Sequence, residues 1–146
     1  MIVRRTPREI ELIRSSCQIV FLVQRVLEEA IGPGISTFEL DALAEKTIRA
    51  HGAIPAFKGY RGFPASICAS INAATVHGIP DATCLRAGDI ISVDVGVLLD
   101  EYYGDGAFTI GIGQIDDELQ HLLDTTHACL DLGIQQARAN NRVSDI

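Results

Sequence analysis

Two aspartates, Asp94 and Asp105, occur in β-rich runs that flank a short turn. Strand side chains alternate between the two faces of a sheet, so each run has one apolar face and one face that carries an aspartate. The apolar face of the first run consists of Ile91, Val93, Val95 and Val97, and that of the second consists of Phe108, Ile110 and Ile112. The neighbours on the aspartate faces are small or polar: Ser92, Gly96, Ala107, Thr109 and Gly111.

The two runs are predicted to form an antiparallel hairpin, and its register decides whether the carboxylates meet. A turn at Leu99-Asp100 sets Asp94 opposite Asp105, whereas a turn at Asp100-Glu101 makes them diagonal neighbours. Either register places the two side chains within roughly 5–8 Å at Cβ. A slip by one residue would move Asp105 onto the apolar face, so the hydrophobic pattern itself favours convergence.

Two converging carboxylates repel each other unless one takes up a proton or a cation lies between them. Carboxylate oxygens are ligands for hard divalent ions, so the arrangement of Asp94 and Asp105 predicts a metal site. The residues alone leave a second interpretation open, in which the two acids are unrelated and lie on a solvated hairpin face.

The stretch from Ala53 to Pro80 is rich in glycine and proline, and Phe57, Tyr60 and Phe63 are interleaved with them. This composition suits a loop that holds a shaped apolar wall, although a connecting loop whose aromatics cap the core has the same texture. His77 lies just before a turn, where a histidine has either a structural or a catalytic role.

Composition limits the class of protein. The chain of 146 residues is long enough for one domain, and its 47% of hydrophobic residues predict an ordered core. The net charge of −7 argues against nucleic acid as a ligand. The four cysteines are widely spaced, which is typical of reduced thiols in the cytoplasm. We expect no membrane association, because no apolar run reaches the length of a membrane span.

Three helices are predicted to support this region. Capping boxes at Thr6–Glu9 and Ser36–Glu39 open the first two, which end near Ile31 and Gly52. Asp116 is the predicted N-cap of the third. The apolar stripe of the first helix is Ile10, Ile13, Cys17, Val20, Leu27 and Ile31. That of the second is Leu40, Leu43, Ala44 and Ile48, and that of the third is Leu119, Leu122, Leu123, Thr126, Cys129, Leu130 and Ile134.

Four segments together resemble successive motifs of one enzyme family. They are GYRGFPASICASIN (59–72), VHGIP (76–80), GDIISVDVGV (88–97) and YGDGAF (103–108). In order and spacing they resemble the type I methionine aminopeptidases, metallopeptidases with the pita-bread fold, and the resemblance runs from the first capping box to the last residue. It implies an α+β fold in which an antiparallel sheet is backed by helices, with residues 1–146 as a single domain corresponding to the first half of the pita-bread fold.

The resemblance also implies roles for individual residues. Asp94 would ligate one of two divalent metal ions (Co, Mn, Fe, Zn or Ni) and Asp105 would bridge both. His77 would act in catalysis by contacting the substrate near the scissile amide. The residues that match the methionine-binding pocket are Phe57, Tyr60, Phe63 and Cys68. Departures from the usual family residues affect only the surroundings of the site: Val76, Tyr103 and Gly106 replace a frequent cysteine, a histidine and a threonine.

The implied activity is hydrolytic removal of the initiator methionine from nascent proteins, with their N-terminal peptides as substrates and the ribosome as a further candidate partner. In the family the remaining ligands, one histidine and two glutamates, come from the second half of the fold. We therefore expect the 146-residue chain by itself to be inactive. Two other hypotheses are a non-catalytic pita-bread relative that acts as a binding module, and a truncated product without function.

Overall fold

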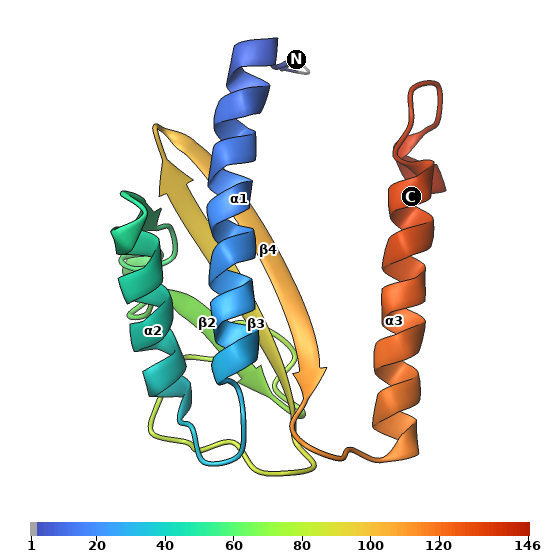
Figure 1. The fold of residues 1–146 in the computed structure, drawn as a ribbon. Coiled ribbons are helices and arrows are strands. Elements are labelled where there is room, and N and C mark those ends of the chain that lie inside the picture. Colours follow the sequence, from blue (N-terminus) through green and yellow to red (C-terminus); the bar gives the residue numbers. More distant parts are fainter. Residues whose placement is uncertain (1–2) are drawn as a thin grey trace.

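The computed structural model describes residues 3–146, which form three long helices and one sheet (Figure 1). The helices are α1 (Pro7–Ala30), α2 (Thr37–Ala50) and α3 (Asp117–Gln136). The strands are β1 (Ile54–Pro55), β2 (Ile67–Ile71), β3 (Ile90–Leu99) and β4 (Tyr102–Gly111). Two 3-10 turns, η1 (Tyr60–Gly62) and η2 (Val143–Asp145), complete the elements.

β3 and β4 form the predicted hairpin, joined by a two-residue turn at Asp100 and Glu101. Both turn residues have positive φ, 48° and 68°, as in a type I′ turn, whose twist matches that of the flanking strands. Leu99 pairs with Tyr102, so the second of the two predicted registers is confirmed.

The four strands form one antiparallel sheet with β3 at its centre. β4 pairs with one edge of β3, while β2 and the short β1 follow one another along the other edge. Within residues 3–146, β4 pairs with β3 alone, so its outer edge has no strand beside it (Figure 1). The strand at Ile54–Pro55 was not predicted from the sequence.

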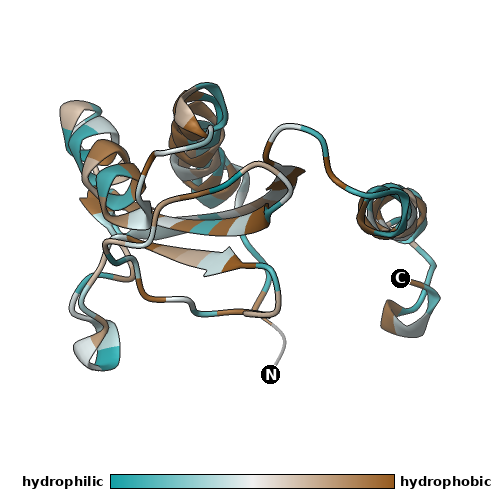
Figure 2. Cartoon of the chain, turned by 90° about the horizontal axis from the view of Figure 1, so that it is seen from below, coloured by the Kyte–Doolittle hydropathy of each residue, from teal (hydrophilic) through white to brown (hydrophobic). Residues whose placement is uncertain are grey.

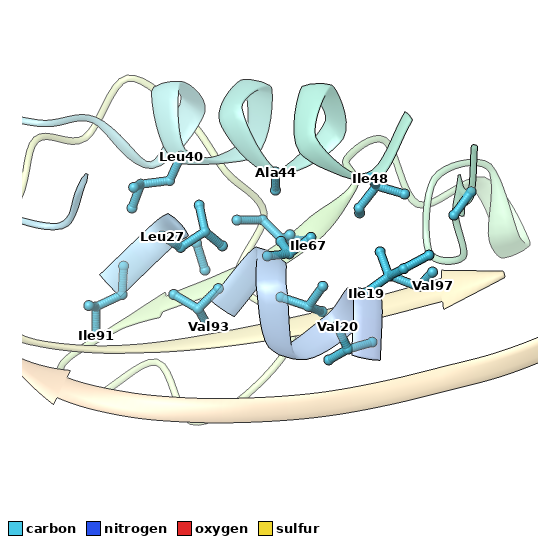
Figure 3. Close-up of a cluster of buried hydrophobic side chains, with 14 of the residues drawn as sticks. Ile19, Val20, Leu27, Leu40, Ala44, Ile48, Ile67, Ile91, Val93 and Val97 are labelled. Carbon is cyan, nitrogen blue, oxygen red and sulfur yellow. The ribbon is translucent and has the colours of Figure 1, made fainter. Parts of the chain in front are cut away.

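α1 and α2 lie side by side on one face of the sheet, as the view from below shows (Figure 2). Both begin with the predicted reciprocal capping boxes, in which Thr6 and Glu9, and Ser36 and Glu39, exchange hydrogen bonds. Their buried residues meet the apolar faces of β2 and β3 in one cluster (Figure 3). Complete burial of a Leu, Ile or Val side chain stabilises the fold by roughly 1.5–3 kcal/mol. The fully buried members include Val23, Leu27, Leu40, Ile48, Ile67, Ile91, Val93, Val95 and Val97.

The stripe predicted for α1 is partly wrong. Ile10 and Cys17 are exposed, and Ser16, Ile19 and Val23 face the sheet instead. The cause is Gly104 of β4, where an added Cβ would lie 2.6 Å from the carbonyl carbon of Ser16. This glycine lets the helix backbone approach the strand, and the Ser16 hydroxyl donates to the Tyr102 carbonyl at 2.9 Å. The small, polar Ser16 is therefore the residue at which α1 contacts β4 most closely.

α3 begins after Asp116, whose side chain accepts a hydrogen bond from the Leu119 amide, as predicted for the N-cap. The residues of its predicted apolar stripe are uncovered, because no residue of α3 is buried in the described chain. The helix stands apart from the sheet, and hydrophobic and hydrophilic residues are both exposed around it (Figure 2). Its most exposed large hydrophobic residues are Leu122, Leu130, Leu132 and Ile134.

None of the helices in the described part of the chain is both long and apolar enough to cross a membrane.

Candidate metal centre and pocket

The face of the sheet that carries the aspartates lines a cavity of about 570 Å³. The structure brings all seven residues predicted from the sequence to this one cavity: Phe57, Tyr60, Phe63, Cys68, His77, Asp94 and Asp105. Four further lining residues, Arg61, Gly62, Pro64 and Ile79, were not singled out from the sequence. All four lie within the GYRGFP and VHGIP motifs, so these motifs were the sequence signal from which the four residues could have been predicted.

Asp94 and Asp105 come from the two strands of the hairpin. Asp94 pairs with Ala107 and Asp105 with Gly96, which makes the carboxylates diagonal neighbours on one face. Asp94 is half-buried and Asp105 is exposed. Burial raises the pKa of Asp94, and the charge of Asp105 raises it further, while His77 has a smaller opposing effect. The pair therefore has the electrostatics of a cation-binding site.

One oxygen of Asp94 supplies a more specific test of whether a metal fits. Its Oδ1 atom is buried and has no hydrogen-bond partner in the structure. A buried carboxylate oxygen without a donor is costly, and a divalent cation would satisfy it. The donor set thus fits a hard divalent ion held by Asp94 and Asp105. Among residues 3–146 no three His, Cys, Asp or Glu side chains are grouped closely enough to hold an ion.

The floor of the cavity depends on the small residues that the sequence places beside the aspartates. At Gly96 an added Cβ would lie 2.3 Å from the ring of Phe57, so glycine is needed for this ring to rest on β3. Cys68 of β2 is the register partner of Asp94 and is buried. Burial, and then the charges of Asp94 and Asp105, raise the pKa of the Cys68 thiol to about 11. Cys68 is therefore a neutral, weakly polar part of the wall near pH 7.

His77 lies in the loop between β2 and β3, and its Nδ1 atom is 3.9 Å from the Cys68 sulfur. Its backbone is left-handed, with a φ of 58°. Next to it, Gly78 packs so closely on β2 that an added Cβ would lie 2.2 Å from the Ala69 carbonyl oxygen. The chain thus presses its backbone against β2 at Gly78 and presents the imidazole of His77 to the cavity.

The residues of the η1 turn also line the cavity. Gly59, Arg61 and Gly62 all have positive φ, so the aromatic residues are held by a tightly bent backbone. The Arg61 guanidinium carbon lies 5.4 Å from the centre of the Tyr60 ring, within cation–π range. Tyr60 and Arg61 are exposed, while Phe57 and Phe63 are half-buried.

A comparison with protein families identifies the chain. Residues 11–146 match the model of metallopeptidase family M24. The chain belongs to metallopeptidase family M24. All 146 residues align at 48% identity with methionine aminopeptidase 1 of Bacillus subtilis, covering 59% of that protein. Members of this family are metallopeptidases, so the match supports the use of divalent metal.

Two solved structures of M24 methionine aminopeptidases have the same fold. That of Thermotoga maritima matches with a TM-score of 0.90 at 33% identity, over 94% of this chain and 55% of that one. That of Rickettsia prowazekii matches with a TM-score of 0.89 at 34% identity, over 92% of this chain and 54% of that one. The predicted fold is confirmed: an antiparallel sheet backed by helices, the N-terminal portion of the pita-bread fold. The chain spans little more than half the length of these relatives.

Proposed function

We propose that residues 1–146 are one domain of a metallo-aminopeptidase that hydrolyses the bond after an N-terminal methionine, acting on the N-terminal peptides of nascent proteins. The observation that carries this proposal is the common cavity, where a carboxylate pair, a histidine and an aromatic wall face the same space. The relatives named methionine aminopeptidase, with the family match, support the reaction class.

The carboxylates are the proposed metal ligands, with Asp94 on one ion and Asp105 shared by two. The unpartnered Oδ1 of Asp94 and the diagonal placement of Asp105 support this assignment. Bound divalent ions, whether Co, Mn, Fe, Zn or Ni, would supply Lewis-acid activation at the scissile carbonyl. The chain's own contribution is to hold two anionic groups on a rigid hairpin, where the register keeps their separation fixed.

The apolar wall is the proposed binding site for the methionine side chain. Phe57, Phe63 and Cys68 line the cavity with two rings and a neutral thiol, and the exposed Tyr60 lines it as well. Such a lining favours a long, unbranched, polarisable thioether over charged side chains, whose desolvation it does not compensate. The wall and the carboxylates border the same cavity, so a side chain in the pocket leaves its backbone near the acids.

His77 is the proposed contact to the scissile amide. It lines the cavity together with both aspartates and is exposed to it. Neutral imidazole offers one donor and one acceptor, so the ring can orient a peptide group or hold a proton in transit. A reducing compartment such as the cytoplasm fits the four free cysteines of the chain.

The test is a chimera in which residues 1–146 are joined to the part of the Bacillus subtilis relative that this chain does not cover. The chimera should release methionine from a Met-Ala-Ser peptide when Mn²⁺ or Co²⁺ is added. Release should be lost in Asp105→Asn. It should persist in the matched control Asp100→Asn, because Asp100 lies in the exposed hairpin turn. A folded chimera that binds metal but releases no methionine would contradict the proposal.

The pocket is tested in the same chimera. Phe63→Ala should lower kcat/KM for methionine relative to alanine at the substrate N-terminus, because the half-buried ring is part of the wall. An unchanged ratio of the two kcat/KM values would mean that the side-chain pocket lies elsewhere.

A further inference from the structure

We propose that Ser70 is a positioning residue for His77, and that its hydroxyl fixes the loop from which the imidazole reaches the cavity. The catalytic importance of His77 rests on the proposed function, whereas the position that Ser70 gives it does not. Ser70 lies on β2, two residues after Cys68, and is 4% exposed. It does not line the cavity and was not among the predicted site residues.

The first step is the backbone of His77. A φ of 58° is left-handed, a region that is unfavourable for a non-glycine residue because its Cβ atom crowds the following carbonyl oxygen. Such a conformation persists only when the surrounding structure holds it in place. An interaction next to His77 must therefore stabilise this backbone conformation.

The second step is the contact of Gly78 with β2. The Ala69 amide donates to the Gly78 carbonyl at 2.9 Å, as in a strand pair. The Gly78 amide, however, does not return the bond to a backbone carbonyl. It donates to the Ser70 hydroxyl oxygen at 3.0 Å. The Ser70 hydroxyl thus accepts the hydrogen bond that a backbone carbonyl would accept in a regular pair of strands.

The third step is that this segment has few other attachments. In the described chain, the hydrogen bonds that residues 75–80 make with other segments are the two at Gly78 and the long contact of His77 with Cys68. The next anchor is Asp81, whose amide donates to the Thr37 hydroxyl and whose carbonyl accepts from the Phe38 amide. Gly78 is therefore the point that sets where the preceding residue, His77, lies.

The consequence concerns the Ser70→Ala variant. The Gly78 amide would be left without its acceptor against a buried strand, and the segment of His77 would lose one of the two hydrogen bonds that hold Gly78 on β2. The imidazole should then leave its position beside Cys68, although the carboxylates on β3 and β4 keep theirs. Ser92 offers a matched control. It lies directly opposite Ser70 in the register, but its hydroxyl pairs with that of Thr109 at 2.8 Å.

The experiment uses the 146-residue chain, labelled with ¹⁵N and ¹³C, as wild type, Ser70→Ala and Ser92→Ala. We expect Ser70→Ala to accelerate hydrogen exchange of the Gly78 amide about five- to tenfold, the loss of one hydrogen bond. We also expect it to abolish the nuclear Overhauser effect between the His77 ring and the Cys68 β protons. Ser92→Ala should change neither readout.

Two results would overturn the inference: a Ser70→Ala variant that keeps both signals, or a Ser92→Ala variant that loses them equally. The wild type provides a test even if Ser70→Ala does not fold. Its Gly78 amide should be protected from exchange while that of His77, which has no described acceptor, exchanges fast. Equal rates at the two amides would also overturn it. None of these readouts requires peptidase activity, so an inactive chimera would contradict the proposed function and leave this inference standing.

Discussion

Asp94 and Asp105 lie diagonally across the β3–β4 hairpin, and each has a small residue directly opposite it, Ala107 and Gly96 respectively. Neither carboxylate therefore has a charged residue opposite it on the hairpin, and both face the same cavity. The burial of Asp94 and its repulsion by Asp105 together raise the pKa of Asp94. In addition, the buried Oδ1 atom of Asp94 has no hydrogen-bond donor. A divalent cation would relieve both penalties at once.

We therefore predict weak binding of Mn²⁺ or Co²⁺ by the 146-residue chain, measurable by titration calorimetry. Asp94→Asn should weaken it at least about tenfold, or about 1.4 kcal/mol. Asp100→Asn, which makes the same charge change in the exposed turn, should have little effect. Equal affinities for wild type and Asp94→Asn would refute the assignment of Asp94.

A second prediction concerns Cys68. Because its pKa is raised to about 11, only about one thiol in a hundred is ionised at pH 9. Iodoacetamide at that pH should modify the exposed Cys17, Cys84 and Cys129 well before Cys68, as followed by peptide mass spectrometry. Asp94→Asn removes one of the negative charges that raise this pKa, so Cys68 should react faster in that variant. Asp100→Asn is again the control, and an unchanged rate in Asp94→Asn would mean that burial alone protects the thiol.

The sequence predicts the hairpin and both capping boxes because each depends on local chemistry. The set of residues around the cavity was expected instead from the resemblance of four motifs to one enzyme family. Alternation fixes the faces of β3, and Thr6 with Glu9 marks a helix start. The sequence did not distinguish a turn at Leu99-Asp100 from one at Asp100-Glu101. The observed turn requires positive φ at Asp100 and Glu101, which are not glycines.

The stripe of α1 was misplaced for a tertiary reason. The helix turns Ser16 rather than Cys17 toward the sheet, because Gly104, far along the chain, allows a close approach there. Similarly, apolar spacing identifies α3 as amphipathic but does not specify what covers it, and no residue of α3 is buried in the described structure.

A third prediction uses Glu9, which accepts hydrogen bonds from the Thr6 amide at 2.7 Å and the Thr6 hydroxyl at 2.8 Å. These bonds, the backbone one foremost, lower the pKa of Glu9 from 4.5 to about 2. A pKa depressed in the folded state gives stability that is full above pH 4.5 and is lost as the pH falls toward 2.

Glu9→Gln should therefore lower the free energy of unfolding at pH 7, and its difference from wild type should shrink between pH 5 and pH 3 in urea titrations. Glu11→Gln provides the control, since Glu11 makes only an exposed ion pair with Arg14 at 3.2 Å. A difference for Glu9→Gln that does not vary with pH would contradict the role of the charge.

A fourth prediction is self-association of the 146-residue chain. α3 exposes Leu130 and Ile134 one turn apart, each about 60% exposed, and the outer edge of β4 has no described partner. Such surfaces favour association. Light scattering should report a mass above that of the monomer, and a Leu130→Lys, Ile134→Lys double variant should move it toward the monomer. A Gln120→Lys, Gln135→Lys variant adds the same charge at polar positions of α3 and should not.

The last prediction is that the 146-residue chain alone releases no methionine. A metal held by two aspartates leaves most of its coordination positions to water, so it exchanges readily and is poorly fixed against a substrate carbonyl. The described residues offer no group of three candidate ligands, and His121 and His127 lie on the exposed α3, where His127 faces Asp131 at 3.5 Å. A Met-Ala-Ser peptide incubated with the chain and Mn²⁺ or Co²⁺ should therefore stay intact by mass spectrometry, under conditions in which the chimera cleaves it. Turnover by the chain that disappears in Asp105→Asn would show that two aspartates and the surrounding cavity suffice, and the ligand count would then be the wrong criterion.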